Sequence, residues 1–207
     1  GDRAAEPSDG DPFAGGAAMS IGPDRTALIL IDVIADFFAP GAQNHYPRSL
    51  EVLPAIRALL DRAREGDRLV VHAVERHRPG IDDHEWRRLA PHAYIGSPEA
   101  AYVEGFEPDP ERAREIEVPK RRYSAFFATD LALTLDEQDI GRVILVGVKT
   151  NVCLRATAQD AFAHGFDVVV PRDATNSNRP ALEAAALEDL GRYFGDVVDL
   201  TTALGML

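Results

Sequence analysis

The stretch RVILVGVKTNVC, residues 142–153, combines a strand pattern, a turn and the beginning of a helical pattern. Residues 143–148 are an unbroken run of apolar residues and glycine, which is typical of a strand buried on both faces of a parallel sheet. The only cysteine of the chain, Cys153, follows at the turn. Open α/β sheets bind ligands at the carboxyl ends of their strands, and a helix amino terminus there favours a thiolate. Cys153 is therefore a candidate nucleophile, with a small buried hydrophobic residue as the alternative role.

The same alternation of strand and helix patterns extends along the chain from residue 26. Strands are predicted at residues 27–31, 68–73, 116–118, 143–148, 168–170 and 197–200, and helices at 49–65, 129–138, 152–164 and 180–194. Six strands alternating with helices predict one α/β domain with three αβα layers and a six-stranded, mainly parallel sheet. The irregular segment 77–115, rich in proline and glycine, is expected to be a lid or a wall of the functional site.

Composition narrows the class of partner. The net charge of −12, from 34 acidic and 22 basic residues, argues against nucleic acid and anionic membranes as partners and favours a small molecule. A single cysteine allows no intrachain disulfide, and no apolar run approaches the ~20 residues that span a bilayer. We therefore expect a cytoplasmic protein, with residues 1–18 as a mobile leader and residues 19–207 as the folded domain.

Two charged residues follow other predicted strands. Asp32 comes directly after the strand at 27–31, and Lys120 comes just after the strand at 116–118. The carboxyl ends of parallel strands share one edge of the sheet, so both side chains are expected beside Cys153. Taken alone, Asp32 could instead cap a turn and Lys120 could be a solvated surface charge.

Three motifs together resemble the isochorismatase-like cysteine hydrolase family. They are LILIDV at 28–33, KRRYSAF at 120–126 and GVKTNVCL at 147–154, and the resemblance extends over about residues 26–200. It implies the family's Rossmann-like strand order and a catalytic triad of Asp32, Lys120 and Cys153. It also implies an oxyanion hole made by the backbone N–H groups of Lys149 and Cys153, a cis peptide between Val148 and Lys149, and a homo-dimer or homo-tetramer.

The resemblance implies hydrolysis of a C–N amide or ureido bond in a small molecule, through a thioacyl intermediate and without a cofactor. Family members that cleave the vinyl ether of isochorismate need no nucleophile, so the presence of Cys153 favours amide hydrolysis. Lys120 and the helix amino terminus are expected to lower the pKa of the thiol. Asp32 would accept the thiol proton and later deliver it to the leaving nitrogen.

Two alternatives stay open. Nicotinamidases of this family bind a metal through an Asp-x-His element and a further histidine, and here Glu75, His77 and His84 are the residues identified as substitutes. The surrounding Arg-x-x-His-Arg-Pro pattern is more similar to ureido-hydrolysing members, which lack the metal, so no metal is predicted. The second alternative is a non-catalytic binding or scaffold protein on the same fold.

Substrate contacts are predicted for a set of aromatic and polar residues near the motifs: Phe37, Arg78, Tyr123, Phe126, Asn151 and Arg155. Arginines of this kind pair with carboxylates or ureido oxygens, but most arginines are surface charges. The aromatic residues could equally pack in the core, and Asn151 could hold the turn. Lys149 replaces the small residue that the family usually has there, and the sequence leaves open whether its amine reaches the pocket.

Overall fold

The apolar run that follows residue 26 forms the middle of a parallel sheet in the computed structural model, which describes residues 21–207. Strand β1 (Thr26–Ile31) pairs in parallel with β2 (Leu69–Glu75) on one side and β4 (Arg142–Val148) on the other. The order across the sheet is β3-β2-β1-β4-β5-β7, and a two-residue strand, β6, also pairs with β4. The remaining strands are β3 (Glu115–Lys120), β5 (Asp167–Pro171), β6 (Thr175–Asn176) and β7 (Asp196–Val198).

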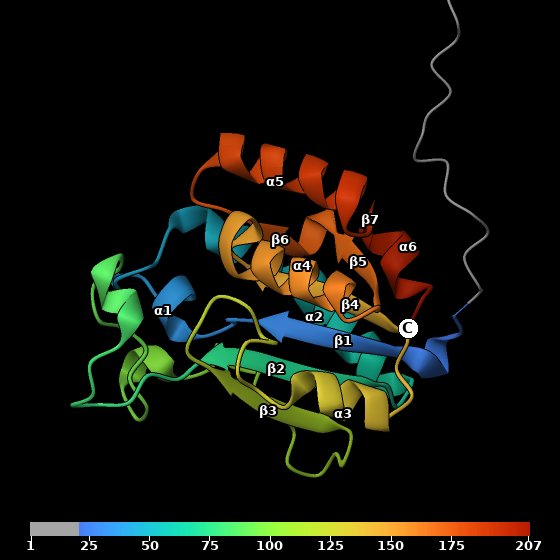
Figure 1. Cartoon of the computed structure of the whole chain (residues 1–207), viewed down its shortest axis with the longest axis horizontal. Coiled ribbons are helices and arrows are strands. Elements are labelled where there is room, and N and C mark those ends of the chain that lie inside the picture. The colour runs from blue at the N-terminus through green and yellow to red at the C-terminus, as the bar shows by residue number, and fades with distance from the viewer. Residues whose placement is uncertain (1–20) are drawn as a thin grey trace, which may run out of the picture.

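Helices cover both faces of this sheet (Figure 1). The longer helices are α2 (Leu53–Glu65), α3 (Leu131–Glu137), α4 (Arg155–Ala163) and α5 (Pro180–Tyr193), with short α1 (Ala35–Phe38) and α6 (Leu200–Leu204). Because side chains alternate along a strand, Leu28 and Leu30 of β1 pack with α2 and α6, whereas Ile29 and Ile31 pack with α3, α4 and α5. The remaining helical segments are short 3₁₀ helices and one π-helical turn: η1 (Pro23–Arg25), η2 (Pro47–Val52), η3 (His84–Arg87), η4 (Pro98–Ala100), π-helical η5 (Thr150–Leu154) and η6 (Arg172–Ala174).

The predicted three-layer α/β architecture with a parallel sheet is confirmed. Four local features differ from the predictions: β6 was missed, the helix predicted from residue 49 begins as the 3₁₀ helix η2, the helix predicted from residue 152 begins as the π-turn η5, and the last strand ends at Val198 rather than at residue 200. That strand is shorter because the Asp199 side chain accepts a hydrogen bond from the Thr202 backbone N–H and thereby caps α6. The predicted leader, residues 1–18, lies outside the described residues. Within residues 21–207, no helix has the length and apolar content needed to cross a membrane.

Gly147 lets β4 lie close against β1. Its φ of +112° is in the region that favours glycine, and a Cβ built there would lie 2.0 Å from the Ile31 carbonyl oxygen. Gly165 also has a positive φ, +89°, but a Cβ there would have no atom within 4 Å. The two glycines therefore separate the effect of backbone conformation from the effect of a steric clash.

We predict that Gly147→Ala lowers the free energy of unfolding by about 3 kcal/mol or more, because clash adds to strain. Gly165→Ala, the matched control, should cost about 1–2 kcal/mol from strain alone. Urea unfolding followed by circular dichroism measures both. Equal losses in the two variants would contradict the close approach of β1 and β4.

Candidate active site

Four neighbouring strands each deliver one functional side chain to the same edge of the sheet. Asp32 follows β1, Glu75 ends β2, Lys120 ends β3, and Cys153 lies in the π-turn η5 after β4. Since β3, β2, β1 and β4 are adjacent in this order, residues far apart in the chain meet at one place. The structure thus brings together the three residues predicted as a triad, and it adds Glu75.

The side chains form a buried network of charges. Lys120 Nζ lies 2.8 Å from Asp32 Oδ2 and 3.6 Å from Glu75 Oε1. Asp32 Oδ1 accepts a hydrogen bond from the Glu75 backbone N–H at 2.9 Å, and Cys153 Sγ donates to Glu75 Oε1 at 3.8 Å. The sulfur and one oxygen of each carboxylate lie within 4.8 Å of one another. Glu75 could have been found by the signal that identified Asp32, namely an acidic residue at the end of an apolar strand.

The two carboxylates have different affinities for a proton. Burial raises the pKa of Asp32 to about 6, in spite of the nearby Lys120 ammonium. Burial acts on Glu75 in the same direction, but Lys120 and a hydrogen bond from His92 outweigh it and lower its pKa to about 2. Asp32 and Cys153 hold the pKa of Lys120 above its usual range although burial opposes this. Asp32 is therefore the better base of the pair, and Lys120 stays charged.

The pKa of the Cys153 thiol differs from the prediction. We expected Lys120 and the helix amino terminus to lower its pKa, but burial raises the pKa of Cys153, and Asp32 and Glu75 add to this rise while Lys120 opposes it. The prediction considered the cation and omitted the desolvation and the second carboxylate. The sulfur is thus a neutral thiol at rest, and it needs a base beside it to become a nucleophile.

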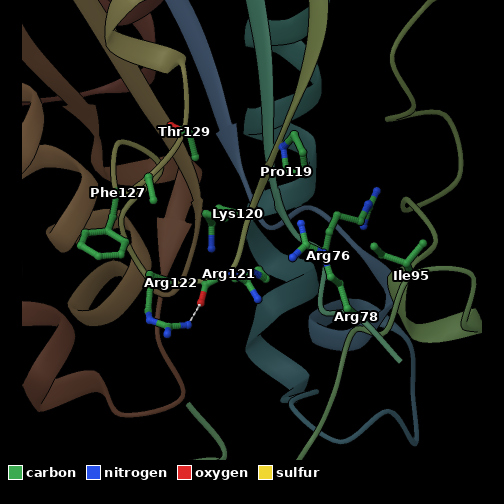
Figure 2. Close-up of a pocket in the computed structure, with 10 residues that line it drawn as sticks. Arg76, Arg78, Ile95, Pro119, Lys120, Arg121, Arg122, Phe127 and Thr129 are labelled. Carbon is green, nitrogen blue, oxygen red and sulfur yellow. Dashed lines mark hydrogen bonds between the residues drawn. The ribbon is translucent and has the colours of Figure 1, made fainter. Parts of the chain in front are cut away.

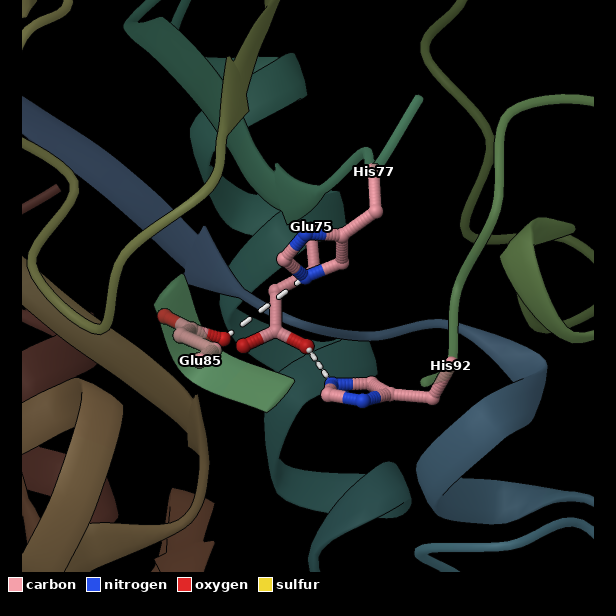
Figure 3. A group of neighbouring side chains, drawn as sticks. All are labelled: Glu75, His77, Glu85 and His92. Atoms are coloured by element: carbon pink, nitrogen blue, oxygen red, sulfur yellow. Dashed lines mark hydrogen bonds and ion pairs between the residues drawn. The ribbon is translucent and has the colours of Figure 1, made fainter. Parts of the chain in front are cut away.

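A second cluster of ionisable side chains lies next to this network (Figure 3). Glu75, His77, Glu85 and His92 are buried, and one ligand atom of each lies within 4.8 Å of the others. His92 Nε2 is 2.7 Å from Glu75 Oε2, and His77 Nε2 is 3.6 Å from Glu85 Oε2. His84, which the sequence offered as a possible substitute ligand, does not belong to the cluster, because its side chain is exposed while those of Glu85 and His92 are buried. Glu85 and His92 lie in the irregular segment 77–115, where no periodicity could have selected them.

The donor set of this cluster fits a divalent metal ion. Buried His77 Nε2 and both oxygens of Glu85 have no hydrogen-bond partner among the described residues. Two imidazoles and two carboxylates suit ions such as Zn²⁺. Burial disfavours the charged form of His92, but the hydrogen bond with Glu75 outweighs it and raises the pKa of His92 to about 9. Burial and Glu75 raise the pKa of Glu85 to about 7, which reduces its charge near neutrality.

A small cavity of about 140 Å³ opens onto Cys153. Its walls are mostly apolar, with a few polar groups: Phe37, Asn44, Glu75, Leu89, Tyr123, Lys149, Val152 and Cys153. Phe37 and Tyr123 thus line the pocket that holds the thiol, in agreement with their predicted positions. Lys149 also lines the cavity, and its Nζ lies 5.7 Å from the centre of the Phe37 ring, which lines the same cavity.

Arg78 lies in a different pocket, together with Arg76, Arg121 and Arg122 (Figure 2). Arg122 donates a hydrogen bond at 2.7 Å to Asp83, which Arg121 also approaches. The predicted contact of Arg78 with a substrate at Cys153 is therefore not supported, because none of these arginines lines the cavity at the sulfur.

Three other predicted contacts also lie outside this cavity. Phe126 packs in the hydrophobic core with α4, Asn151 Oδ1 accepts a hydrogen bond from Ser177 Oγ, and Arg155 forms a salt bridge with Asp189 at 3.1 Å. Each residue therefore has the structural role that was the alternative to substrate binding. Phe126 packs in the core, Asn151 holds the turn, and Arg155 is a charge at the surface.

The predicted cis peptide between Val148 and Lys149 is present. It leads from β4 into the π-turn that carries Cys153, and a 2.7 Å hydrogen bond between the hydroxyls of Thr150 and Thr175 joins this turn to β6. The backbone N–H groups of Lys149 and Cys153 thus lie at the two ends of one turn beside the cavity, and their role as oxyanion donors stays a prediction.

Comparisons with known proteins find similar sequences and similar structures. A sequence model described as "Isochorismatase domain" matches residues 26–202. A maleamate amidohydrolase of Pseudomonas putida is 35% identical over 203 residues, which is 95% of this chain and 94% of that protein. An isochorismatase-like hydrolase from Alkaliphilus metalliredigens superposes with a TM-score of 0.79 at 33% identity, covering 86% and 96% of the two chains. A Pyrococcus horikoshii pyrazinamidase in complex with zinc gives 0.75 at 31% identity, covering 84% and 99%.

Alkylation tests the raised pKa of Cys153. The thiolate is the reactive form, so iodoacetamide should react slowly at about pH 6 and faster as the pH rises. Glu75→Gln removes a carboxylate that raises this pKa, so it should speed alkylation several-fold near neutrality, whereas the exposed control Glu104→Gln should not. Mass spectrometry follows the single cysteine. Rapid alkylation of the unchanged protein at about pH 6 would show a thiolate at rest and contradict this account.

Proposed function

The chain belongs to the isochorismatase family, and we propose that it hydrolyses the C–N bond of a small amide or ureido compound through a thioester on Cys153. One observation carries the proposal: a buried thiol, a carboxylate of raised pKa and an ammonium meet at the end of a small cavity. A nucleophile beside a base that a third group orients is the arrangement that covalent acyl transfer requires.

In the first half of the reaction, the Asp32 carboxylate accepts the proton of the thiol while Sγ attacks the carbonyl carbon of the substrate. The carbonyl oxygen becomes an oxyanion, and we propose that the backbone N–H groups of Lys149 and Cys153 stabilise it. Asp32 then gives the proton to the nitrogen as the C–N bond breaks. Ammonia or an amine leaves, and the acyl group stays on the sulfur.

In the second half, water replaces the departed nitrogen. Asp32 is again a carboxylate at this point. It accepts a proton from the water while the water oxygen attacks the thioester carbon. The C–S bond breaks, the proton returns to the sulfur, and the free acid leaves. The pKa of Asp32, about 6, suits both roles, because a group with a pKa near the working pH can accept and return a proton.

Lys120 orients Asp32 throughout this cycle. Its ammonium lies between two carboxylates and compensates both, which keeps Asp32 ionised although it is buried. The low pKa of Glu75 makes it a poor base, so its part is to hold Lys120 and to accept the thiol hydrogen bond at rest.

The substrate that we propose is a small carboxamide. The cavity is small and mostly apolar, and the relative that matches most of the chain is named for the hydrolysis of maleamate, an amide of four carbon atoms. We also propose that the enzyme is a homo-oligomer, as the resemblance to the family implies.

A metal-containing, nicotinamidase-type amidase is the second candidate function. The observation that favours it is the cluster of Glu75, His77, Glu85 and His92, with its unpartnered buried donor atoms. These four residues would hold the ion, which when bound supplies Lewis-acid polarisation of a substrate atom. In the leading proposal no ion is bound, and His92 is hydrogen-bonded to Glu75.

Substitution of Cys153 tests the nucleophile. Cys153→Ser should reduce ammonia release from maleamate, succinamate or ureidoacrylate by roughly 10⁴-fold or more, because a hydroxyl is a much weaker nucleophile in a site built for sulfur. With hydroxylamine present, the unchanged enzyme should form the hydroxamate, which reports the thioester. The exposed control His84→Ala should keep full activity. Undiminished turnover by Cys153→Ser would refute the covalent mechanism and would leave a binding or scaffold role open.

Metal removal separates the two candidate functions. We predict that dialysis against a chelator leaves amide hydrolysis unchanged. The single tryptophan, Trp86, lies 4.4 Å from the His77 ring, so quenching of its fluorescence by Co²⁺ measures occupation of the cluster directly. Three results together would favour the metal-containing alternative. The purified protein would contain stoichiometric metal, chelation would abolish turnover, and quenching would be lost in Glu85→Gln but not in His84→Ala.

A further inference from the structure

Lysine is rare in this chain, and both lysines lie at the candidate active site. Of the 22 lysines and arginines, only Lys120 and Lys149 are lysines. The positive charge of Lys120 is compensated by the carboxylates of Asp32 and Glu75. Lys149 has no such partner, and the mechanism above uses only its backbone N–H. Its ammonium is therefore a charged group at the cavity whose role is not yet explained.

Two aromatic rings hold the Lys149 side chain in place. Its Nζ lies 5.7 Å from the centre of the Phe37 ring and 5.5 Å from that of Tyr46. Tyr46 is itself fixed, because its hydroxyl donates a hydrogen bond to the side-chain oxygen of Asn176 at 2.9 Å and lies 3.2 Å from the Asn176 carbonyl oxygen. Cations over aromatic rings are stabilised, so the ammonium is positioned beside the cavity that contains Cys153.

The ammonium of Lys149 makes no salt bridge and no side-chain hydrogen bond within residues 21–207. The acidic groups nearest to it are occupied elsewhere: Asp36 accepts a hydrogen bond from Asn44, and Glu75 is held by His92 and Lys120. Burial lowers the pKa of Lys149. A half-buried cation without an anion is unfavourable, and an anionic ligand in the cavity would relieve this cost.

Arginine does not compete for this role. The cavity at Cys153 is lined by no guanidinium among the described residues. Arg155 is paired with Asp189, and Arg78, Arg121 and Arg122 line the separate pocket of Figure 2. Among the residues that line this cavity, Lys149 is thus the one with a cationic side chain, and a negatively charged substrate in the cavity would meet it.

We propose that the Lys149 side chain binds a carboxylate of the substrate, so that the enzyme selects short amides that carry a carboxylate. This inference rests on the proposed function. The same residue offers its backbone N–H to the reacting carbonyl and its ammonium to the far end of the substrate. One side chain therefore sets the spacing between the two groups, which favours a short spacer in a cavity of about 140 Å³.

A matched pair of substrates tests the proposal on the unchanged enzyme. Succinamate and its neutral diamide, succinamide, have the same shape and differ in one carboxylate, so the ratio of their kcat/KM values isolates the charge. Hydrogen bonds between charged groups predict a preference for succinamate of roughly 10- to 100-fold, expressed mainly in KM. A ratio near one would overturn the proposal without any substitution.

Lys149→Met should reduce that ratio by a similar 10- to 100-fold, while Lys149→Arg, which keeps the charge, should retain most of it. The neutral diamide is the internal reference, so a general loss of activity in either variant cancels. As a second measurement, calorimetric binding of succinamate to Cys153→Ala should weaken by the same factor when Lys149→Gln is added. An unchanged ratio in Lys149→Met, or unchanged binding, would assign carboxylate recognition to another group.

These results separate the inference from the function on which it rests. Hydrolysis of both amides without preference, but dependent on Cys153, would leave the amidohydrolase mechanism intact and remove the role of Lys149. Turnover that survives Cys153→Ser would instead refute the mechanism itself. A series of half-amides with longer spacers adds a further check, because kcat/KM should fall once the carboxylate passes the ammonium.

Discussion

The site depends on one buried ammonium. Lys120 Nζ lies between the carboxylates of Asp32 and Glu75, with all three side chains at most 1% exposed. Removing one partner from such a group costs about 3–5 kcal/mol, because the remaining charges are left without compensation. The same ammonium opposes the rise in the pKa of Asp32 and of the Cys153 thiol. Stability and chemistry thus rest on the same charge.

The parallel sheet is what makes this network possible. Each of the four strands β3, β2, β1 and β4 leads to one functional side chain at its carboxyl end, and the strand order sets which of them are neighbours. The backbone adapts at two of these ends: Asp32 has a φ of +54°, and Gly147 lets β4 lie against β1. Hydrophobic burial therefore fixes the positions of groups that would repel one another or stay hydrated in an unfolded chain.

The contrast between regular strands and irregular segments explains how much could be predicted from the sequence. The fold and the meeting of Asp32, Lys120 and Cys153 follow from local patterns, because strand ends are visible as the point where apolar runs stop. Glu85 and His92 were not predicted, because an irregular segment brings them inward through long-range contacts that have no period. The pKa of Cys153 was predicted with the wrong sign, since desolvation depends on the packing of the whole domain.

In the proposed function, the two lysines compensate different negative charges. The resting site balances Asp32 and Glu75 with Lys120 and His92, so a substrate carboxylate would bring an additional negative charge. Without a cation of its own, that charge would raise the pKa values of Asp32 and Cys153 further and hinder formation of the thiolate. Lys149 lies on the cavity side of the network, where its ammonium can balance the substrate without drawing Lys120 away from Asp32. Binding and catalysis then use separate cations, and the base keeps its proton affinity when an anionic substrate enters.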